Sequence, residues 1–177
     1  AAVFAPARRQ AARRGGRAMT GTPDLVPVGP GHLEVVTTLH GMCFDEPWGR
    51  DVIVAMVAGI GGLGLLALNP ETGAPGGFVL ARVMRDKSEI LSLAVASAYR
   101  QRGWARHLLA AAIDESAARG ADTLGLEVAQ DNTIAIALYR RAGFRVIGHR
   151  ANYYTRDGTT IDADIMRIES NAPRAVR

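Results

Sequence analysis

The apolar positions of this chain recur with two periods, and each period predicts a different kind of element. In TLGLEVA, residues 123–129, every second position is apolar, which is the pattern of a strand with one buried face. Within 104–119 the apolar positions recur every three or four residues from Leu108 to Ile113, and Gly120 follows as a stop signal, so a helix is expected. The two patterns alternate along the chain.

The same periods and the turn residues between them predict eleven elements. We expect strands at 25–28, 63–69, 78–85, 89–95, 123–129, 144–150 and 161–168, and helices after Pro30 and at 50–58, 104–119 and 133–141. The order β-α-α-β-β-β-α-β-α-β-β mixes hairpins with strand–helix crossovers. It therefore predicts one α/β domain built on a mixed sheet.

The longest apolar run, residues 52–68, allows two other interpretations. Its 17 residues approach the length of a membrane span, which is about 20. Its glycines at 59, 61 and 64 also spell G-x-G-x-x-G, the dinucleotide-binding motif. Glycines in the middle of the run favour a turn, and the motif would have to follow a strand and open a helix, the reverse of the order here. We therefore expect neither a membrane span nor a dinucleotide site.

Composition changes this picture only at the ends of the chain. With 48% hydrophobic and 21% charged residues, the 177-residue chain resembles an ordinary globular protein. Its net charge is +4, but residues 1–18 hold five arginines and 171–177 two more, which leaves 14 basic against 17 acidic residues, a net −3, in 19–170. We expect a disordered extension at 1–18, a folded domain at 19–170 and a flexible tail at 171–177. A nucleic-acid partner is not expected, because the domain itself is mildly acidic.

Cysteine and histidine usage restricts the chemistry. Cys43 is the single cysteine, so no internal disulfide can form, and a reducing compartment, the cytoplasm, is expected. The segment 1–18 has no apolar stretch of the kind that a secretory signal needs. The four histidines fall at no metal-ligand spacing, and we expect no metal site at His32, His40, His107 and His149.

The segment YRQRGWARH, residues 99–107, lies between the strand at 89–95 and the helix at 104–119. A helix N-terminus presents unpaired backbone N–H groups and the positive end of the helix dipole, which together favour an anion site. Gly103 would let the main chain approach a ligand closely. A solvated basic loop is the alternative.

Glu127 is the one acidic residue in an otherwise apolar strand. It could be a general base, or it could be an edge-strand glutamate that faces water. Asn132 follows as a candidate N-cap of the next helix, and Tyr139 within that helix could be either a functional phenol or a core aromatic.

Together these segments resemble the GNAT acetyltransferases. RQRGWA at 100–105 is similar to the family's Q/R-x-x-G-x-G/A motif, which grips the pyrophosphate of coenzyme A, and LGLEVAQDNTIAIALYRRAGF at 124–144 resembles the second half of the fold. FDEPW at 44–48 and RANYYTRDGTTIDADIM at 150–166 resemble the RimI-type alanine N-acetyltransferases. The resemblance covers about residues 25 to 168.

The resemblance implies a GNAT-like acyl-CoA N-acyltransferase fold, with acetyl-CoA as co-substrate and no metal. It assigns Glu127 as general base and Tyr139 as general acid in a direct transfer. The cofactor would enter between the strands at 89–95 and 123–129, which we expect to splay apart at their C-terminal ends. Cofactor contacts are implied for Leu93, Ala94, Val95, Gln101, Arg102, Gly103, Trp104, Ala105, Arg106 and Asn132.

The resemblance also implies a substrate, the N-terminal alanine of protein eighteen of the small ribosomal subunit, with no nucleic-acid or membrane partner. Trp48, Tyr153 and Tyr154 could wall a groove for its backbone. One departure bears on peptide specificity: Ala129 stands where relatives often have arginine. Two alternatives stay open, a GNAT enzyme for a small amine or a protein lysine, and a cofactor-binding sensor without turnover.

Overall fold

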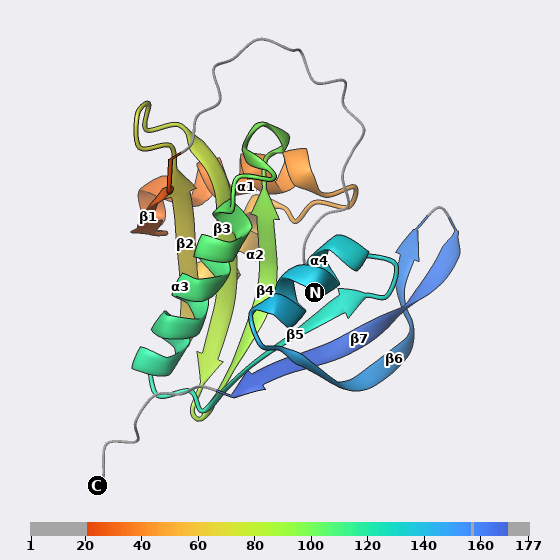
Figure 1. The fold of residues 1–177 in the computed structure, drawn as a ribbon. Helices are drawn as coiled ribbons and strands as arrows, with labels where there is room; N and C mark the ends of the chain where they lie inside the picture. The colour runs from red at the N-terminus through yellow and green to blue at the C-terminus, as the bar shows by residue number, and fades with distance from the viewer. Residues whose placement is uncertain (1–20, 157, 170–177) are drawn as a thin grey trace, which may run out of the picture.

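The computed structural model describes residues 21–156 and 158–169 as a seven-stranded mixed sheet with helices on both faces (Figure 1). The predicted extension at 1–18 and tail at 171–177 lie outside the described residues. The elements are β1 Asp24–Pro27, η1 Pro30–His32, α1 Leu33–Cys43, α2 Arg50–Ala58, β2 Gly62–Leu68, β3 Pro75–Met84, β4 Lys87–Val95, η2 Ser97–Tyr99, α3 Trp104–Ala118, β5 Thr123–Ala129, α4 Thr133–Arg141, β6 Arg145–Arg156 and β7 Thr159–Glu169.

The predicted order of strands and helices is confirmed, and the bounds of α2, β5 and α4 match the prediction. Four strands, β3, β4, β6 and β7, are longer than predicted, and β3 and β6 differ most clearly in where they begin or end. β3 begins at Pro75 rather than at 78, because Gly76 and Gly77 extend the strand where bulkier residues would collide with Trp104 and Leu108. β6 continues to Arg156 rather than ending at 150. Its pairing with β7 shifts register at two places and resumes after each, so the irregular positions do not end the strand.

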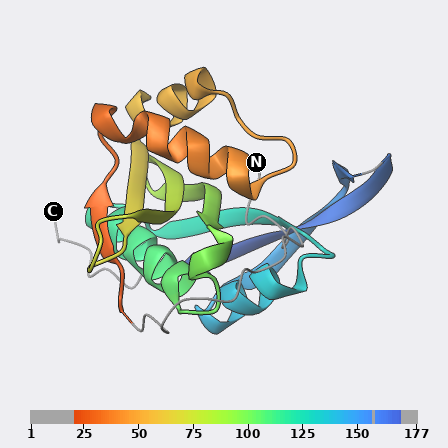
Figure 2. The same ribbon diagram turned by 90° about the horizontal axis from the view of Figure 1, so that it is seen from above.

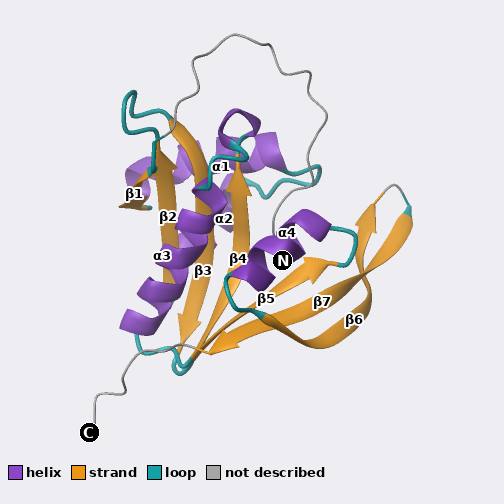
Figure 3. Cartoon of the chain, viewed as in Figure 1, coloured by secondary structure: helices purple, strands orange, loops and turns teal. Residues whose placement is uncertain are grey.

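The strand order is β1-β2-β3-β4-β5-β7-β6, and β4–β5 is its parallel pair (Figure 3). These two strands pair only where Lys87–Glu89 lies beside Thr123–Gly125. Past that point they diverge, as Figure 1 shows. The predicted splay of these strands is therefore present. β4 also carries a register shift against β3 between Leu80 and Ala81, and such a bulge bends a strand away from its former line.

Two apolar clusters hold the helices to the sheet. α3 and α4 cover one face, and α1 and α2 cover the other, which is clearest in the view from above (Figure 2). The cluster under α3 and α4 includes Leu126, Val128 and Tyr139. The cluster under α1 and α2 includes Phe78 and Leu80 of β3. The alternation along β5 therefore sends Glu127 to the α1–α2 face and its two neighbours to the α3–α4 face.

The glycine-rich run forms the turn between α2 and β2, as predicted, and its glycines are required by close contacts. Gly61 has φ 75°, and its carbonyl accepts a hydrogen bond from Val83 N at 2.8 Å. A Cβ on Gly61 would lie 1.9 Å from the Val83 carbonyl oxygen. The run is thus a structural turn rather than a phosphate loop. None of the described helices has the length and apolar character to cross a membrane.

Gly61→Ala is expected to destabilise the fold more than Gly73→Ala. Both glycines have left-handed φ values, 75° and 69°, so both variants should lose about 1–2 kcal/mol from that conformation. Only Gly61 adds the overlap with Val83, whereas nothing lies within 4 Å of a Cβ on Gly73. Urea unfolding of the two variants measures the difference. Equal losses would show that the turn relaxes freely.

Candidate active site

Glu127 lies on β5 beside the gap that opens between β4 and β5. β5 is an interior strand, with β4 on one side and β7 on the other, and Glu127 is only 6% exposed. The alternative of an edge-strand glutamate facing water is therefore wrong. Its Oε1 lies 2.8 Å from Nε of Arg150, and the Tyr153 phenol hydrogen-bonds the same carboxylate. The Tyr154 hydroxyl donates to the Glu127 backbone oxygen at 3.2 Å.

An irregular stretch of β6 lets two consecutive tyrosines reach the same residue. In a regular strand, neighbouring side chains point to opposite faces. Here the register shifts between Arg150 and Tyr154, and Asn152 takes a left-handed φ of 54°. The rings of Tyr153 and Tyr154 then meet edge to face at 5.0 Å. The hydrogen bond to Glu127 raises the pKa of Tyr153, and burial raises the pKa of Tyr154, so both remain neutral phenols.

Tyr139 is a core tyrosine, and its hydroxyl is buried. It is fully buried on α4, and its ring packs against Phe144 at 5.7 Å. Among the described residues its hydroxyl has no hydrogen-bond partner. Burial first, and the nearby Tyr154 second, raise the pKa of Tyr139, so the phenol keeps its proton. An unpaired buried hydroxyl costs about 1–3 kcal/mol. A bound ligand atom could accept its hydrogen bond.

The basic loop turns sharply into the first turn of α3. Gln101 and Gly103 both have left-handed backbone, with φ 60° and 81°. Such a conformation costs a non-glycine residue about 1–3 kcal/mol and is common at ligand sites. Within the described residues no side chain caps α3 at Gly103. The N–H groups of the first turn therefore face outward and can bind an anion.

A cavity of about 670 Å³ opens between this loop and α4. Seven of the ten predicted cofactor residues line it, namely Val95, Gln101, Gly103, Trp104, Ala105, Arg106 and Asn132. Leu93 and Ala94 do not line it and are buried in β4, and the guanidinium of Arg102 lies 5.9 Å from the centre of the Tyr99 ring. Asn132 also caps α4, accepting a hydrogen bond from Ala135 N at 3.3 Å.

Sequence reasoning missed the α4 side of this cavity. The lining residues there are spaced as one helix face, Ile134, Ala137, Leu138 and Arg141. That spacing was a usable signal, as was Ile134 itself, a large apolar side chain that is 66% exposed. Arg141 adds a cationic side chain to the cavity, which Arg100 and Arg106 also line.

The side chain of Arg100 makes hydrogen bonds to β4 and α1 rather than to the first turn of α3. Its Nε donates to the Val95 carbonyl at 2.9 Å, and its guanidinium hydrogen-bonds the thiol of Cys43. Arg100 thus connects the end of β4 to the end of α1. Burial raises the pKa of Cys43, which keeps it a thiol. The structure gives Cys43 no role as a nucleophile.

Trp48 is held in place by a buried histidine. The imidazole of His40 stacks on Phe44 at 4.2 Å and on Trp48 at 4.9 Å, and its Nδ1 accepts a hydrogen bond from Trp48 N at 3.2 Å. Burial lowers the pKa of His40 to about 4. The loop between α1 and α2 and the β6–β7 hairpin lie toward the same end of the molecule (Figures 1 and 2). Trp48 and the tyrosine pair thus come from two segments at that end.

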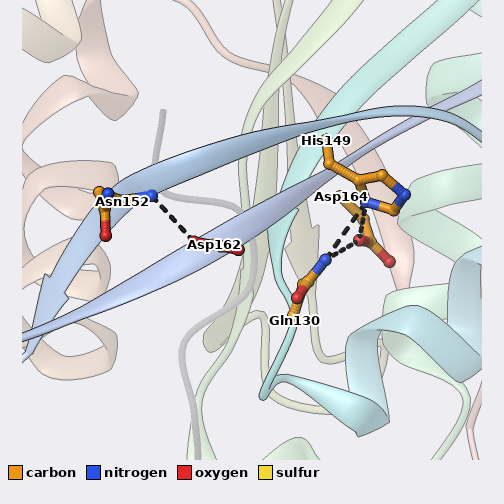
Figure 4. Close-up of polar contacts among 5 residues, drawn as sticks. All are labelled: Gln130, His149, Asn152, Asp162 and Asp164. Carbon is orange, nitrogen blue, oxygen red and sulfur yellow. Dashed lines mark hydrogen bonds and ion pairs between the residues drawn. The ribbon is translucent and has the colours of Figure 1, made fainter.

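A polar network fixes the arm that carries the tyrosines. Asp164 Oδ1 accepts from Gln130 Nε2 at 2.7 Å and lies 2.9 Å from His149 Nδ1 (Figure 4). Asn152 N donates to Asp162 Oδ1 at 2.9 Å. These contacts join the end of β5 to β6 and β7, and no sequence pattern predicted them. The part of the chain that the structure describes contains no group of side chains suited to hold a metal ion.

Fold and site together define an acyltransferase architecture, and comparison with known proteins identifies the family. The acetyltransferase (GNAT) family model matches residues 34–144, and this chain belongs to that family. The predicted fold class and the resemblance to the family are confirmed.

Several relatives within the family carry the name of a more specific enzyme. The chain is 42% identical over 92 residues to the ribosomal protein bS18-alanine N-acetyltransferase of Haemophilus ducreyi, and 40% identical over 99 residues to the Escherichia coli protein of that name. These matches cover 51% and 55% of this chain, and 63% and 66% of those relatives, just under two thirds of their length. The crystal structure of the Escherichia coli enzyme aligns with a TM-score of 0.79 at 28% identity, over 88% of this chain and 99% of that one.

Acid is expected to destabilise the protein through His40. The pKa of His40 falls from 6.5 to about 4 on folding, so its neutral form stabilises the fold fully above pH 6.5. That contribution, roughly 3 kcal/mol, should disappear as the pH falls from 6.5 towards 4. Urea unfolding across this range should show a shallower pH dependence for His40→Gln than for the wild type. His107→Gln, on the surface of α3, serves as the control, and identical slopes for all three proteins would contradict the assignment.

Proposed function

We propose that this protein transfers the acetyl group of acetyl-CoA to the N-terminal α-amine of a protein, the N-terminal alanine of ribosomal protein bS18. One observation carries the proposal. Glu127, on β5 beside the gap between β4 and β5, and Tyr139, in the core cluster under α3 and α4, lie on opposite faces of the sheet. An amine could approach from the Glu127 face and a thioester from the Tyr139 face, so that the two react within the gap.

The residues on the Tyr139 face fit coenzyme A. The cavity joins the uncapped N-terminus of α3 to an apolar wall on α4, with Arg106 and Arg141 among its lining residues. This arrangement suits a pyrophosphate followed by a pantetheine arm. The unpaired hydroxyl of Tyr139 offers a donor to the sulfur. Related folds have been solved with this ligand, for example Arabidopsis thaliana NAA60 in complex with acetyl-CoA, with a TM-score of 0.76 and 22% identity.

Acetyl-CoA supplies the acetyl group as a thioester. An α-ammonium has a pKa of about 7.7–8.0 and must lose a proton before its nitrogen can attack the carbonyl carbon. The carboxylate of Glu127 accepts that proton, directly or through a water. The new C–N bond forms as the C–S bond breaks. No covalent enzyme intermediate is needed, in keeping with the buried Cys43 thiol.

Tyr139 acts on the leaving group, the sulfur of coenzyme A. A leaving thiolate belongs to a thiol whose pKa is about 8.5, as for cysteine. Because burial raises the pKa of Tyr139, its phenol stays protonated and donates a hydrogen bond to the departing sulfur. That hydrogen bond stabilises the developing thiolate, and because the raised pKa makes the phenol a weaker acid than the thiol, the proton that converts the thiolate to a thiol comes from solvent. Glu127 gains the proton of the amine, the thiolate takes one proton from solvent, and loss of the Glu127 proton to solvent completes the balance.

The peptide would lie on the Glu127 face. Trp48, held by His40, and the tyrosine pair on β6 provide aromatic walls for its backbone. The bS18 assignment follows the printed names of the relatives. A single cysteine and a protein substrate of the ribosome suit the cytoplasm, where we place the enzyme.

Mass spectrometry after incubation with acetyl-CoA tests the function. The substrate is a peptide that carries the first residues of bS18 with a free N-terminal alanine. A gain of one acetyl group at the α-amine supports the proposal. The same peptide with a blocked N-terminus and an internal lysine, and a free diamine, test the two alternative amine classes. Acetylation of either in place of the α-amine would overturn the substrate assignment, and no transfer to any amine would favour a sensor.

Glu127→Gln should reduce turnover by about 10²–10⁴-fold, the usual contribution of a positioned general base. Glutamine keeps the shape of the side chain but cannot accept the proton. The loss should shrink at high pH, where more amine arrives deprotonated, and acetyl-CoA affinity should stay nearly unchanged. Glu115→Gln on the outer surface of α3 is the matched control. Full activity of Glu127→Gln at neutral pH would remove Glu127 from the mechanism.

Tyr139→Phe should separate activity from stability. The variant keeps the ring in the core and removes only the unpaired hydroxyl, so the free energy of unfolding should stay the same or rise. Turnover should fall by about 10²-fold, because the departing sulfur loses its donor. Urea unfolding and steady-state kinetics on one preparation check both statements. A loss of stability with intact turnover would make Tyr139 a packing residue only.

A further inference from the structure

The carboxylate of Glu127 already has a cationic partner before any substrate arrives. Nε of Arg150 lies 2.8 Å from Oε1 of Glu127, close enough for a charge-assisted hydrogen bond. The Glu127 side chain is 8% exposed, whereas that of Arg150 is 54% exposed. A half-exposed guanidinium therefore borders the one buried carboxylate that the proposed mechanism uses.

The sheet is built so that this side chain can reach across a strand. Arg150 on β6 pairs with Ala163 on β7, which in turn pairs with Ala129 on β5. The three residues form one row on the face that also carries Glu127. Because both alanines end at Cβ, the row leaves a path for the long side chain of Arg150 over β7. The guanidinium also lies 5.3 Å from the centre of the Tyr153 ring, a cation–π contact that holds it beside the carboxylate.

A fixed positive charge at this place affects the amine as well as the carboxylate. It pairs with the Glu127 carboxylate, and it disfavours a second positive charge brought to the same carboxylate. An incoming α-ammonium would meet this guanidinium, whereas the neutral amine would not be repelled. We propose that Arg150 is a positioning residue that shares Glu127 with the substrate amine and favours its deprotonated form. This inference rests on the proposed function.

Among the described side chains whose contacts with Glu127 are known, Arg150 is the cation. Tyr153 and Tyr154 reach it from β6, and both are phenols whose raised pKa keeps them neutral. Its paired residue on β7 is the apolar Ile165. From β4, Glu89 is close enough to influence Tyr153 and carries the opposite charge. From α4, Tyr139 is a buried phenol that keeps its proton.

The test is the pH dependence of kcat at saturating acetyl-CoA and bS18 N-terminal peptide. For the wild type, kcat should rise with pH to a plateau, with an apparent pKa that reports the bound amine. Arg150→Gln should raise that apparent pKa by about one unit, because an adjacent charge typically shifts a pKa by 1–3 units and this one is half exposed to solvent. At the acidic end this is about a tenfold loss of rate, which should vanish at the plateau.

Three further variants make the result specific. Arg150→Lys keeps the charge and should retain the wild-type profile, whereas Arg150→Met should repeat the shift of Arg150→Gln. Arg145→Gln removes a positive charge from the other end of β6, where it pairs with Arg167, and should leave the profile unchanged. Thermal unfolding of each variant confirms that it is folded.

The inference is overturned if Arg150→Gln and Arg150→Met lower kcat by one factor at every pH, or leave the profile unchanged, because a purely structural role predicts those results. It is also overturned if Arg150→Lys behaves like Arg150→Gln. Failure of the proposed function is a different result: the wild type itself would not acetylate the α-amine of the peptide.

Discussion

The separation of β4 from β5 is the constraint on which the rest of this structure depends. Two parallel strands pair over three residues each and then diverge, so backbone groups that would have bonded across the ladder need other partners. The bulge in β4 turns that strand away, and the sheet continues on the far side of the gap through β7 and β6.

Each functional group takes its place from that gap. β4 ends in the loop that turns, through left-handed Gln101 and Gly103, into the N-terminus of α3. β5 carries Glu127 to one face and, through α4, places the Tyr139 hydroxyl on the other. The loop before α3, the carboxylate of Glu127 and the phenol of Tyr139 are thus positioned by two strands and the helices that follow them. Strain at Gln101 and the unpaired Tyr139 hydroxyl are both concentrated here, where a ligand could offset them.

β6 and β7 provide the side chains that surround Glu127, and their position depends on polar contacts outside the apolar core. Asp164 joins Gln130 to His149, and Asp162 holds the backbone of Asn152 (Figure 4). These bonds fix an irregular stretch in which Arg150, Tyr153 and Tyr154 all reach Glu127. A regular strand could not direct all of them to one residue. The irregularity is therefore part of how the carboxylate is surrounded.

The sequence by itself determined the kinds of element and their order, and it singled out the candidate site residues. Period-two and helical spacing are local properties, so the alternation in 123–129 was enough to separate Glu127 from the apolar face of its strand. The motif at 100–105 predicted an anion loop for the same reason, because a helix N-terminus and its glycine are neighbours in the chain. Only the tertiary structure decided that β5 is an interior strand, that α4 lines the cavity through Ile134 and Arg141, and that Arg150 crosses β7 to Glu127. These are relations between segments far apart in sequence, fixed by register, bulges and packing, and no local pattern encodes them.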